Sequence, residues 1–239
     1  MQINICENPV ATAKAFAEYM LAWHKQHGAM NVALSGGSTP KILFDLLATD
    51  YAAAFDWTKI NLYWGDERCV APTDNDSNYK MTNEHLLAKV NIPEGNIHRV
   101  LGENDPEQEA IRYGQLIEQN LPKKDGNPVF DIIILGMGTD GHTASIFPHE
   151  IELLDSAKTC EVANHPETGQ KRVTLTGPVL NQARSVCFLV TGDNKKEKIK
   201  QIFEEQDVAK SYPAYHINPK EGELIWFLDE AAASSYKKP

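Results

Sequence analysis

Short apolar runs rich in β-branched residues alternate with longer amphipathic segments along most of this chain, and that alternation restricts its fold more than any other feature. The pattern is typical of an α/β protein whose mainly parallel sheet is covered by helices on both faces. The run Ile132-Ile133-Ile134-Leu135 shows no alternation of polar and apolar residues. We therefore expect it to form a central strand that is buried on both faces.

The expected strands and helices follow from these periodicities. Strands are expected at Gln2–Cys6, Asn31–Ser35, Ile60–Trp64, His98–Leu101, Phe130–Gly136, Val186–Thr191 and Leu224–Leu228. Helices are expected at Asn8–His27, Pro40–Ala48, Asn78–Val90, Pro106–Asn120, Val179–Arg184 and Lys195–Glu205. The polar stretch Pro122–Pro128 indicates a surface loop, because strands of the same kind stand on both sides of it. The sequence therefore predicts one domain over residues 1–239.

Net charge and hydropathy narrow the classes of partner. The chain has 23 basic and 33 acidic residues among its 239, a formal net charge of -10. This balance argues against nucleic acid, because a phosphate backbone is held by clustered Lys and Arg, and no such cluster is present. The apolar runs fall far short of the ~20 residues of a membrane span, and the N-terminus lacks the pattern of a secretion signal. We therefore expect a cytoplasmic protein that binds neither nucleic acid nor membrane.

Four loops that follow expected strands have unusual compositions. They are Ser35-Gly36-Gly37-Ser38-Thr39-Pro40, Gly65-Asp66-Glu67-Arg68, Gly136-Met137-Gly138-Thr139-Asp140-Gly141-His142 and Thr191-Gly192-Asp193-Asn194-Lys195-Lys196. Parallel strands would bring all four loops to the same edge of the sheet. Ligands of open α/β sheets bind at that edge, so we expect the functional site there.

The first loop has the composition of an anion site. Gly36 and Gly37 permit close approach of the backbone, Thr39 can cap the following helix, and Pro40 suits its first turn. The N-terminus of a helix carries about half a positive charge and free N–H groups, and the Ser38 hydroxyl lies beside it. The loop lacks the G-K-[ST] ending of a nucleotide-binding loop, which favours a single phosphate group. The alternative interpretation is a glycine turn that only begins a capped helix.

The third loop matches the dinucleotide-binding fingerprint at Gly136-x-Gly138-x-x-Gly141. Its position in mid-chain, an acidic Asp140 where a pyrophosphate would lie, and Pro148 shortly afterwards all disfavour NAD. Asp140 and His142 stand two residues apart, where a carboxylate can orient an imidazole. We therefore expect this pair to take part in chemistry.

Cationic side chains could hold an anion at the same edge. Arg68 lies in the second loop, Lys195 and Lys196 lie in the fourth, and Arg172 could add another cation. Arginine suits bidentate recognition of phosphate or carboxylate, whereas lysine supplies a mobile point charge. Local cations outweigh distant acidic residues, because charges beyond the ~8 Å Debye length are largely screened. One of the two lysines is expected to be only a solvated helix start.

Several common hydrolytic devices are absent from the sequence. It has no G-x-S-x-G elbow, no H-E-x-x-H zinc helix and no Cys-His pair by sequence context. If the protein hydrolyses a substrate, water is the expected nucleophile and His142 the expected base. Such a site suits an activated ester better than an amide, because an amide leaving group needs a stronger catalytic set.

Five motifs in order along the chain together resemble the 6-phosphogluconolactonase family. They are Leu34-Ser35-Gly36-Gly37-Ser38-Thr39-Pro40, Trp64-Gly65-Asp66-Glu67-Arg68, Asp76-Ser77-Asn78-Tyr79, Leu135-Gly136-Met137-Gly138-Thr139-Asp140-Gly141-His142-Thr143-Ala144-Ser145 and Arg172-Val173-Thr174-Leu175-Thr176. The resemblance implies a Rossmann-like α/β sheet, shared with glucosamine-6-phosphate deaminase and related to ribose-5-phosphate isomerase. It also implies hydrolysis of 6-phospho-D-glucono-1,5-lactone in the oxidative pentose phosphate pathway, with neither metal nor cofactor.

The resemblance implies roles for ten residues. The implied phosphate site consists of Gly36, Gly37, Ser38, Arg172 and Lys195. His142 would take a proton from the attacking water and return one to the ring oxygen, and Asp140 would orient it. Arg68 would steady the substrate or the developing oxyanion. Asp66 would contact sugar hydroxyls, with support from Asn78.

Two other functions stay open at this stage. Glucosamine-6-phosphate deaminases carry a glutamate shortly after the D-G-H sequence, whereas this chain reads Ser145-Ile146-Phe147-Pro148. A non-catalytic sugar-phosphate sensor would normally be attached to a DNA-binding helix-turn-helix, for which neither end of the chain has room. The partner is expected to be a small phosphorylated lactone, bound by a monomer or weak homo-oligomer.

Overall fold

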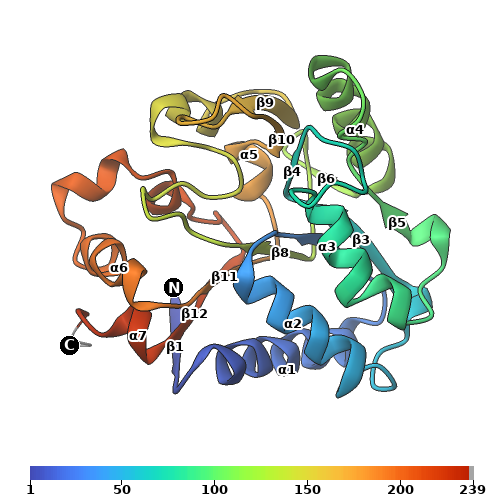
Figure 1. Ribbon diagram of the computed structural model, residues 1–239, viewed down its shortest axis with the longest axis horizontal. Coiled ribbons are helices and arrows are strands. Elements are labelled where there is room, and N and C mark those ends of the chain that lie inside the picture. Colours follow the sequence, from blue (N-terminus) through green and yellow to red (C-terminus); the bar gives the residue numbers. More distant parts are fainter. Residues whose placement is uncertain (237–239) are drawn as a thin grey trace.

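The computed structural model describes residues 1–236, and its centre is a seven-stranded sheet (Figure 1). The strands are β1 (Gln2–Cys6), β2 (Met30–Leu34), β3 (Ile60–Trp64), β5 (Ile97–His98), β8 (Ile132–Leu135), β11 (Ser185–Val190) and β12 (Glu223–Asp229). Their order across the sheet is β1-β12-β11-β8-β2-β3-β5, and all neighbours are parallel. All seven expected strands are thus present, with ends shifted by up to three residues.

Seven α-helices connect or flank these strands within the described residues. They are α1 (Pro9–His27), α2 (Ser38–Thr49), α3 (Asn78–His85), α4 (Pro106–Asn120), α5 (Gly177–Leu180), α6 (Lys196–Phe203) and α7 (Glu230–Ala233). The side chain of Asn8 caps α1 by accepting a hydrogen bond from the Ala11 N–H at 2.9 Å. The expected continuation of α3 to Val90 is wrong, because a separate 3-10 turn follows at Leu87–Lys89.

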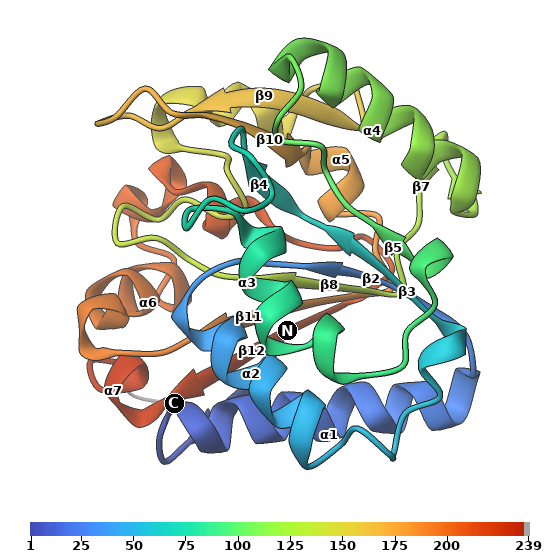
Figure 2. The ribbon, with the colours of Figure 1, turned by 45° about the vertical axis from the view of Figure 1, so that its right-hand side comes forward.

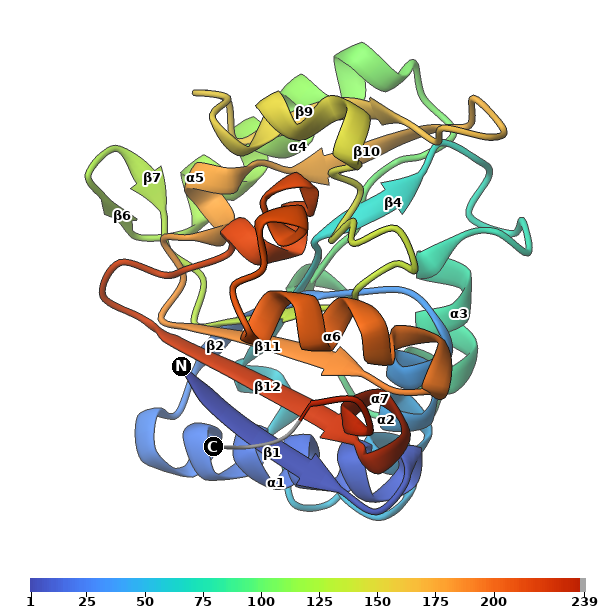
Figure 3. The same ribbon diagram turned by 90° about the vertical axis from the view of Figure 1, so that its left-hand side faces the viewer.

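Helices cover both faces of the main sheet, as the alternation predicts. Adjacent residues of β12 point to opposite faces. The Phe227 ring packs edge-on against Phe16 of α1, with ring centres 5.5 Å apart. The Trp226 ring packs edge-on against Phe203 of α6, with ring centres 5.2 Å apart. Figure 3 shows α6 in front of β11 and β12, on the face opposite α1. The central strand β8 is at most 1% exposed, which confirms its burial on both faces.

A second, antiparallel sheet lies over the main one. It consists of β4 (Asp66–Arg68), β10 (Lys171–Leu175) and β9 (Cys160–Asn164), with β10 in the middle. Figure 2 shows β9, β10 and α4 on one side of the main sheet and α1 and α2 on the other. The expected loop at 65–68 is therefore wrong: most of it is a strand. Three polar residues are too few to show a strand periodicity, and only pairing with β10 reveals it.

The order in which successive strands are added to the sheet reverses between the neighbouring strands β2 and β8. From β2 the chain continues to β3 and β5 on one side, whereas β8 leads to β11 and β12 on the other. Such a reversal opens a crevice beyond the carboxyl ends of the strands. None of the helices in residues 1–236 combines the length and the apolar character needed to cross a membrane.

Candidate active site

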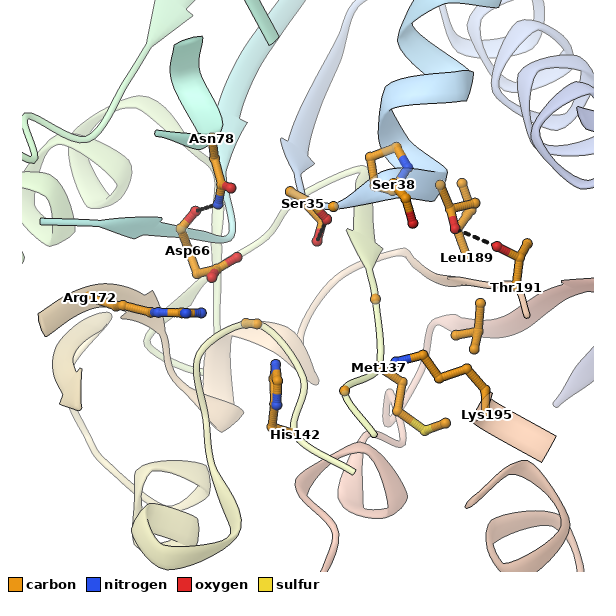
Figure 4. Close-up of a pocket in the computed structure, with 18 of the residues that line it drawn as sticks. Ser35, Ser38, Asp66, Asn78, Met137, His142, Arg172, Leu189, Thr191 and Lys195 are labelled. Carbon is orange, nitrogen blue, oxygen red and sulfur yellow. Dashed lines mark hydrogen bonds between the residues drawn. The ribbon is translucent and has the colours of Figure 1, made fainter. Parts of the chain in front are cut away.

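A cavity of about 270 Å³ lies in this crevice, between the carboxyl ends of β2, β8 and β11 and the paired strands β4 and β10 (Figure 4). Nine of the ten residues proposed from the sequence line it: Gly36, Gly37, Ser38, Asp66, Arg68, Asn78, His142, Arg172 and Lys195. The tenth, Asp140, is hydrogen-bonded to His142. Segments far apart in the sequence therefore meet at one place.

The N-terminus of α2 opens onto the cavity with uncapped N–H groups. The residue before the helix is Gly37, whose φ of 110° is a left-handed value that favours glycine, and no side chain caps the helix. The expected capping role of Thr39 is wrong, because its hydroxyl is hydrogen-bonded to that of Thr191 at 2.8 Å. The first N–H groups of a helix have no partner within it, so those of Ser38 and Thr39 can bind an anion.

Gly36 brings this loop into direct contact with Asn78, the first residue of α3. A Cβ atom at position 36 would overlap the Asn78 side chain, so only glycine fits there. Asn78 is 2% exposed, and its Nδ2 donates to the carbonyl oxygen of Asp66 at 2.9 Å. Asn78 thus joins the loop after β2 to strand β4.

His142 and Asp140, both in the loop after β8, form a hydrogen-bonded pair. Their Nδ1 and Oδ1 atoms are 2.6 Å apart, and the same oxygen accepts from the His142 N–H at 3.1 Å. Burial would raise the pKa of Asp140, but its hydrogen bonds with His142 and the charge of that ring lower it to about 2. The Nε2 atom of His142 has no hydrogen-bond partner within residues 1–236 and stays available on the cavity side of the ring.

Strand β4 directs alternate side chains to opposite sides. Asp66 and Arg68 line the cavity, while the Glu67 carboxylate accepts hydrogen bonds from main-chain N–H groups of Arg68, Asn78 and Tyr79 at 2.7–2.8 Å. Burial raises the pKa of Glu67. Glu67 therefore fixes the start of α3 against the strand that carries Asp66 and Arg68.

Arg172 on β10 lies directly opposite Arg68 in the antiparallel ladder. Its side chain is only 8% exposed, and its guanidinium carbon lies 5.5 Å from the centre of the Phe147 ring. Burial lowers the pKa of Arg172, and the charge of Asp66 opposes this effect. Within the described residues, neither arginine has a carboxylate within 4.0 Å. Two neighbouring guanidinium groups without an acidic partner form a strong anion site.

The two lysines of the last loop have different surroundings. Lys195 lines the cavity just before α6, and burial lowers its pKa. Lys196 points elsewhere and donates to both carboxylate oxygens of Asp193, at 2.8 and 3.0 Å. In Figure 4, Ser38 and Lys195 lie on one side of the cavity, Arg172 and Asp66 lie on the other, and His142 lies between them.

Sequence reasoning gave no role to Ser145 and Thr191. Ser145 donates to Asp66 Oδ2 at 2.6 Å, and Thr191 lines the cavity as the first residue after β11. Thr191 could have been found from its place at a strand end, whereas no local signal distinguishes Ser145. The centres of the His142 and Phe147 rings lie 4.7 Å apart, so an apolar ring packs against His142.

These groups suit chemistry on a small anion: one histidine with a fixed tautomer, a helix terminus and three cations. No group of three or more His, Cys, Asp or Glu side chains in residues 1–236 could hold a metal ion. A parallel α/β sheet with such a crevice is the arrangement of an enzyme for a small anionic molecule.

The sequence profile of one family, glucosamine-6-phosphate isomerases/6-phosphogluconolactonase, matches residues 8–226. The chain belongs to this family.

Relatives support the same grouping. The 6-phosphogluconolactonase of Treponema pallidum is 41% identical over 222 residues, which cover 93% of this chain and 92% of the relative. The crystal structure of a devB protein is 44% identical, with a TM-score of 0.94 and 99% of each chain covered. The 6-phosphogluconolactonase structure from Trypanosoma brucei is 29% identical, with a TM-score of 0.86 over 99% of this chain and 98% of that one.

Proposed function

We propose that this chain hydrolyses 6-phospho-D-glucono-1,5-lactone to 6-phospho-D-gluconate, as a step of the oxidative pentose phosphate pathway. The relatives named 6-phosphogluconolactonase support this activity. The observation that carries it is the His142–Asp140 pair, which leaves Nε2 free beside a cavity with cations on both sides. A base of this kind activates water, and the cations fit a phosphorylated substrate.

In the proposed reaction His142 serves as base and then as acid. Nε2 takes a proton from water as the water oxygen bonds to C1 of the lactone. The bond between C1 and the ring oxygen then breaks, and Nε2 returns the proton to that oxygen, which becomes a hydroxyl. Asp140 accepts from Nδ1–H and stabilises the charged ring between the two transfers.

The proposed substrate contacts use the remaining lining residues. The phosphate lies against the N-terminus of α2, where Gly36, Gly37 and Ser38 offer main-chain and hydroxyl groups. Lys195 and Arg172, which lie on opposite sides of the cavity in Figure 4, are the cations proposed to bind this anion. Arg68 stabilises the oxyanion that forms at C1, and Asp66, held by Asn78, accepts from sugar hydroxyls.

We further propose that residues 1–239 act as one domain, without metal or cofactor, as a monomer or weak homo-oligomer. The proposed location is the cytoplasm. The four cysteines support it, because all are free thiols in the described residues, and free thiols are usual in a reducing compartment. The acidic net charge of -10 supports the proposal that neither nucleic acid nor membrane is a partner.

The proposal is tested by forming the lactone in situ and following its disappearance against spontaneous hydrolysis. We expect a clear acceleration by the wild-type protein and no ammonia release from glucosamine 6-phosphate. The buried Phe147 ring beside His142 supports the second expectation, because it supplies no carboxylate for ring opening. Ammonia release without lactone hydrolysis would replace the proposed function with deamination, and absence of both would leave a sugar-phosphate sensor.

A further inference from the structure

Ser145 does not line the cavity but contacts two residues that do. Its side chain is fully buried, and its Oγ lies 2.6 Å from Asp66 Oδ2 and 3.4 Å from Arg172 Nη1. A hydroxyl has one proton to donate, and an ionised carboxylate can only accept. The proton therefore points to Asp66, and a lone pair of Oγ faces Arg172.

The backbone around Ser145 is held in an unusual turn. Ala144 has a φ of 47°, a left-handed value that is costly for a residue with a side chain. The turn is closed by the Ile146 N–H, which donates to the Thr143 carbonyl at 2.9 Å. The Ser145 N–H donates to Thr174 Oγ1 of β10 at 3.1 Å. Ser145 is thus fixed to β10 by its main chain and to β4 by its side chain.

Asp66 and Arg172 carry opposite charges in a buried place, yet they do not form a direct ion pair within 4.0 Å. The Ser145 hydroxyl bonds to both instead. A direct pair would bind the guanidinium N–H groups and the carboxylate oxygens to each other. The hydroxyl leaves Oδ1 of Asp66 and Nη2 of Arg172 without a hydrogen-bond partner among the described residues, and both residues line the cavity.

We propose that Ser145 is a positioning residue that keeps Asp66 and Arg172 apart and aims both at the substrate. This inference rests on the proposed lactonase function. Without the hydroxyl, Oδ2 of Asp66 has lost its buried donor, and the Arg172 guanidinium, which contacts the same hydroxyl, is the charged donor on its other side. The two charges then pair, and the substrate loses both contacts.

The test is the Ser145→Ala variant, measured with the lactone and, by calorimetry, with 6-phosphogluconate. We expect KM and the product Kd each to rise about tenfold or more, and kcat to fall much less, because both lost contacts hold the ground state. A crystal structure of the variant is expected to show a direct Asp66–Arg172 ion pair. The matched control is Ser185→Ala, which removes a buried hydroxyl bonded to Tyr19 at 2.6 Å, at the amino end of β11. Its KM should stay at the wild-type value.

The pair Ser145→Thr and Ser145→Val separates the hydroxyl from packing, because the two side chains have the same shape. The threonine variant should recover most of the affinity for 6-phosphogluconate, and the valine variant should not. Equal affinity in both, or an alanine variant within twofold of wild type, would overturn the inference. If wild-type protein fails to accelerate lactone hydrolysis, the proposed function falls. The structure of the alanine variant still shows whether the Ser145 hydroxyl keeps Asp66 and Arg172 apart.

Discussion

The two sides of the cavity are built in different ways. The loop wall comprises Gly36–Thr39, Gly136–His142 and Thr191–Lys195, which follow β2, β8 and β11. The strand wall comprises Asp66 and Arg68 on β4 and Arg172 on β10. The loop wall offers main-chain groups and a helix terminus that local sequence positions. The strand wall offers side chains whose positions depend on pairing between distant segments.

The difference has an electrostatic consequence. In the strand wall, Arg68 and Arg172 are direct cross-strand neighbours, an arrangement that like charges make unfavourable. The Nε atoms of both are buried without a hydrogen-bond partner among the described residues. The loop wall carries no such conflict, because a helix terminus is a fixed partial charge of about one half. The strand wall therefore gains more from a bound anion.

The largest predicted effect concerns the loop wall, which carries the proposed base. His142→Ala should lower kcat for lactone hydrolysis by about 10²–10⁴-fold, the usual contribution of general acid–base catalysis. Asp140→Asn should cost less, because asparagine still accepts a hydrogen bond from Nδ1 but lacks the charge that stabilises the protonated ring. Lactone disappearance above the spontaneous rate measures both.

A melting temperature close to wild type is the control for His142→Ala, since the ring lies at the cavity surface. An unchanged kcat in this variant would move the chemistry to the strand wall. Arg68 or Asp66 would then have to act on the attacking water.

The next largest effect compares one cation from each wall. Arg172→Ala should raise KM by about tenfold to a hundredfold, because the phosphate would lose its proposed bond to a buried guanidinium group. Lys195→Ala should raise KM only about two- to fivefold, because its side chain is partly solvated. Steady-state kinetics of both variants give the two increases in KM and their ratio.

Lys196→Ala is the matched control for the lysine, because its ammonium pairs with Asp193 outside the cavity. Its KM should equal that of wild type. A larger effect at Lys195 than at Arg172 would contradict the ranking of the two walls.

The same division explains what the sequence could predict. Strand end, glycine turn and helix start are contiguous in the loop wall, so Gly36–Ser38 and the Asp140–His142 pair could be recognised locally. The one local error there concerned Thr39: threonine is a common helix cap, but the hydroxyl of Thr191 takes its hydrogen bond. That bond joins the loops after β2 and β11 and is invisible in either alone.

The strand wall could not be predicted in the same way. Arg68 and Arg172 were proposed from composition and motif, but nothing in either segment indicates that they face each other. The second sheet was missed because β4 has only three, polar residues and because the five-residue strands β9 and β10 were not recognised either. Ser145 was missed because its role depends on side chains from β4 and β10. Tertiary pairing, which local periodicity does not encode, decides these positions.

The smallest predicted effect concerns folding stability in acid. As pH falls, the contributions of Asp140 in the loop wall and of Glu67 behind the strand wall should change in opposite directions. Asp140 has a pKa lowered from 3.8 to about 2, so its ionised form stabilises the folded protein above pH 3.8, and this contribution is lost as pH falls through about 2. Its side chain is 40% exposed, so the contribution is about 1 kcal/mol or less. The advantage of wild type over Asp140→Asn should therefore shrink in acid.

Glu67, behind the strand wall, should behave in the opposite way. Burial raises its pKa above the ordinary 4.5, so keeping its charge buried costs stability at neutral pH, and that cost disappears as pH falls through the raised pKa. Because glutamine does not titrate, the stability of wild type relative to Glu67→Gln should increase with acidification. Urea unfolding of wild type and both variants, from neutral pH down to about pH 3, gives the free energy of unfolding of wild type relative to each variant. If both relative stabilities changed in the same direction with pH, the two walls would not differ in how they hold their carboxylates.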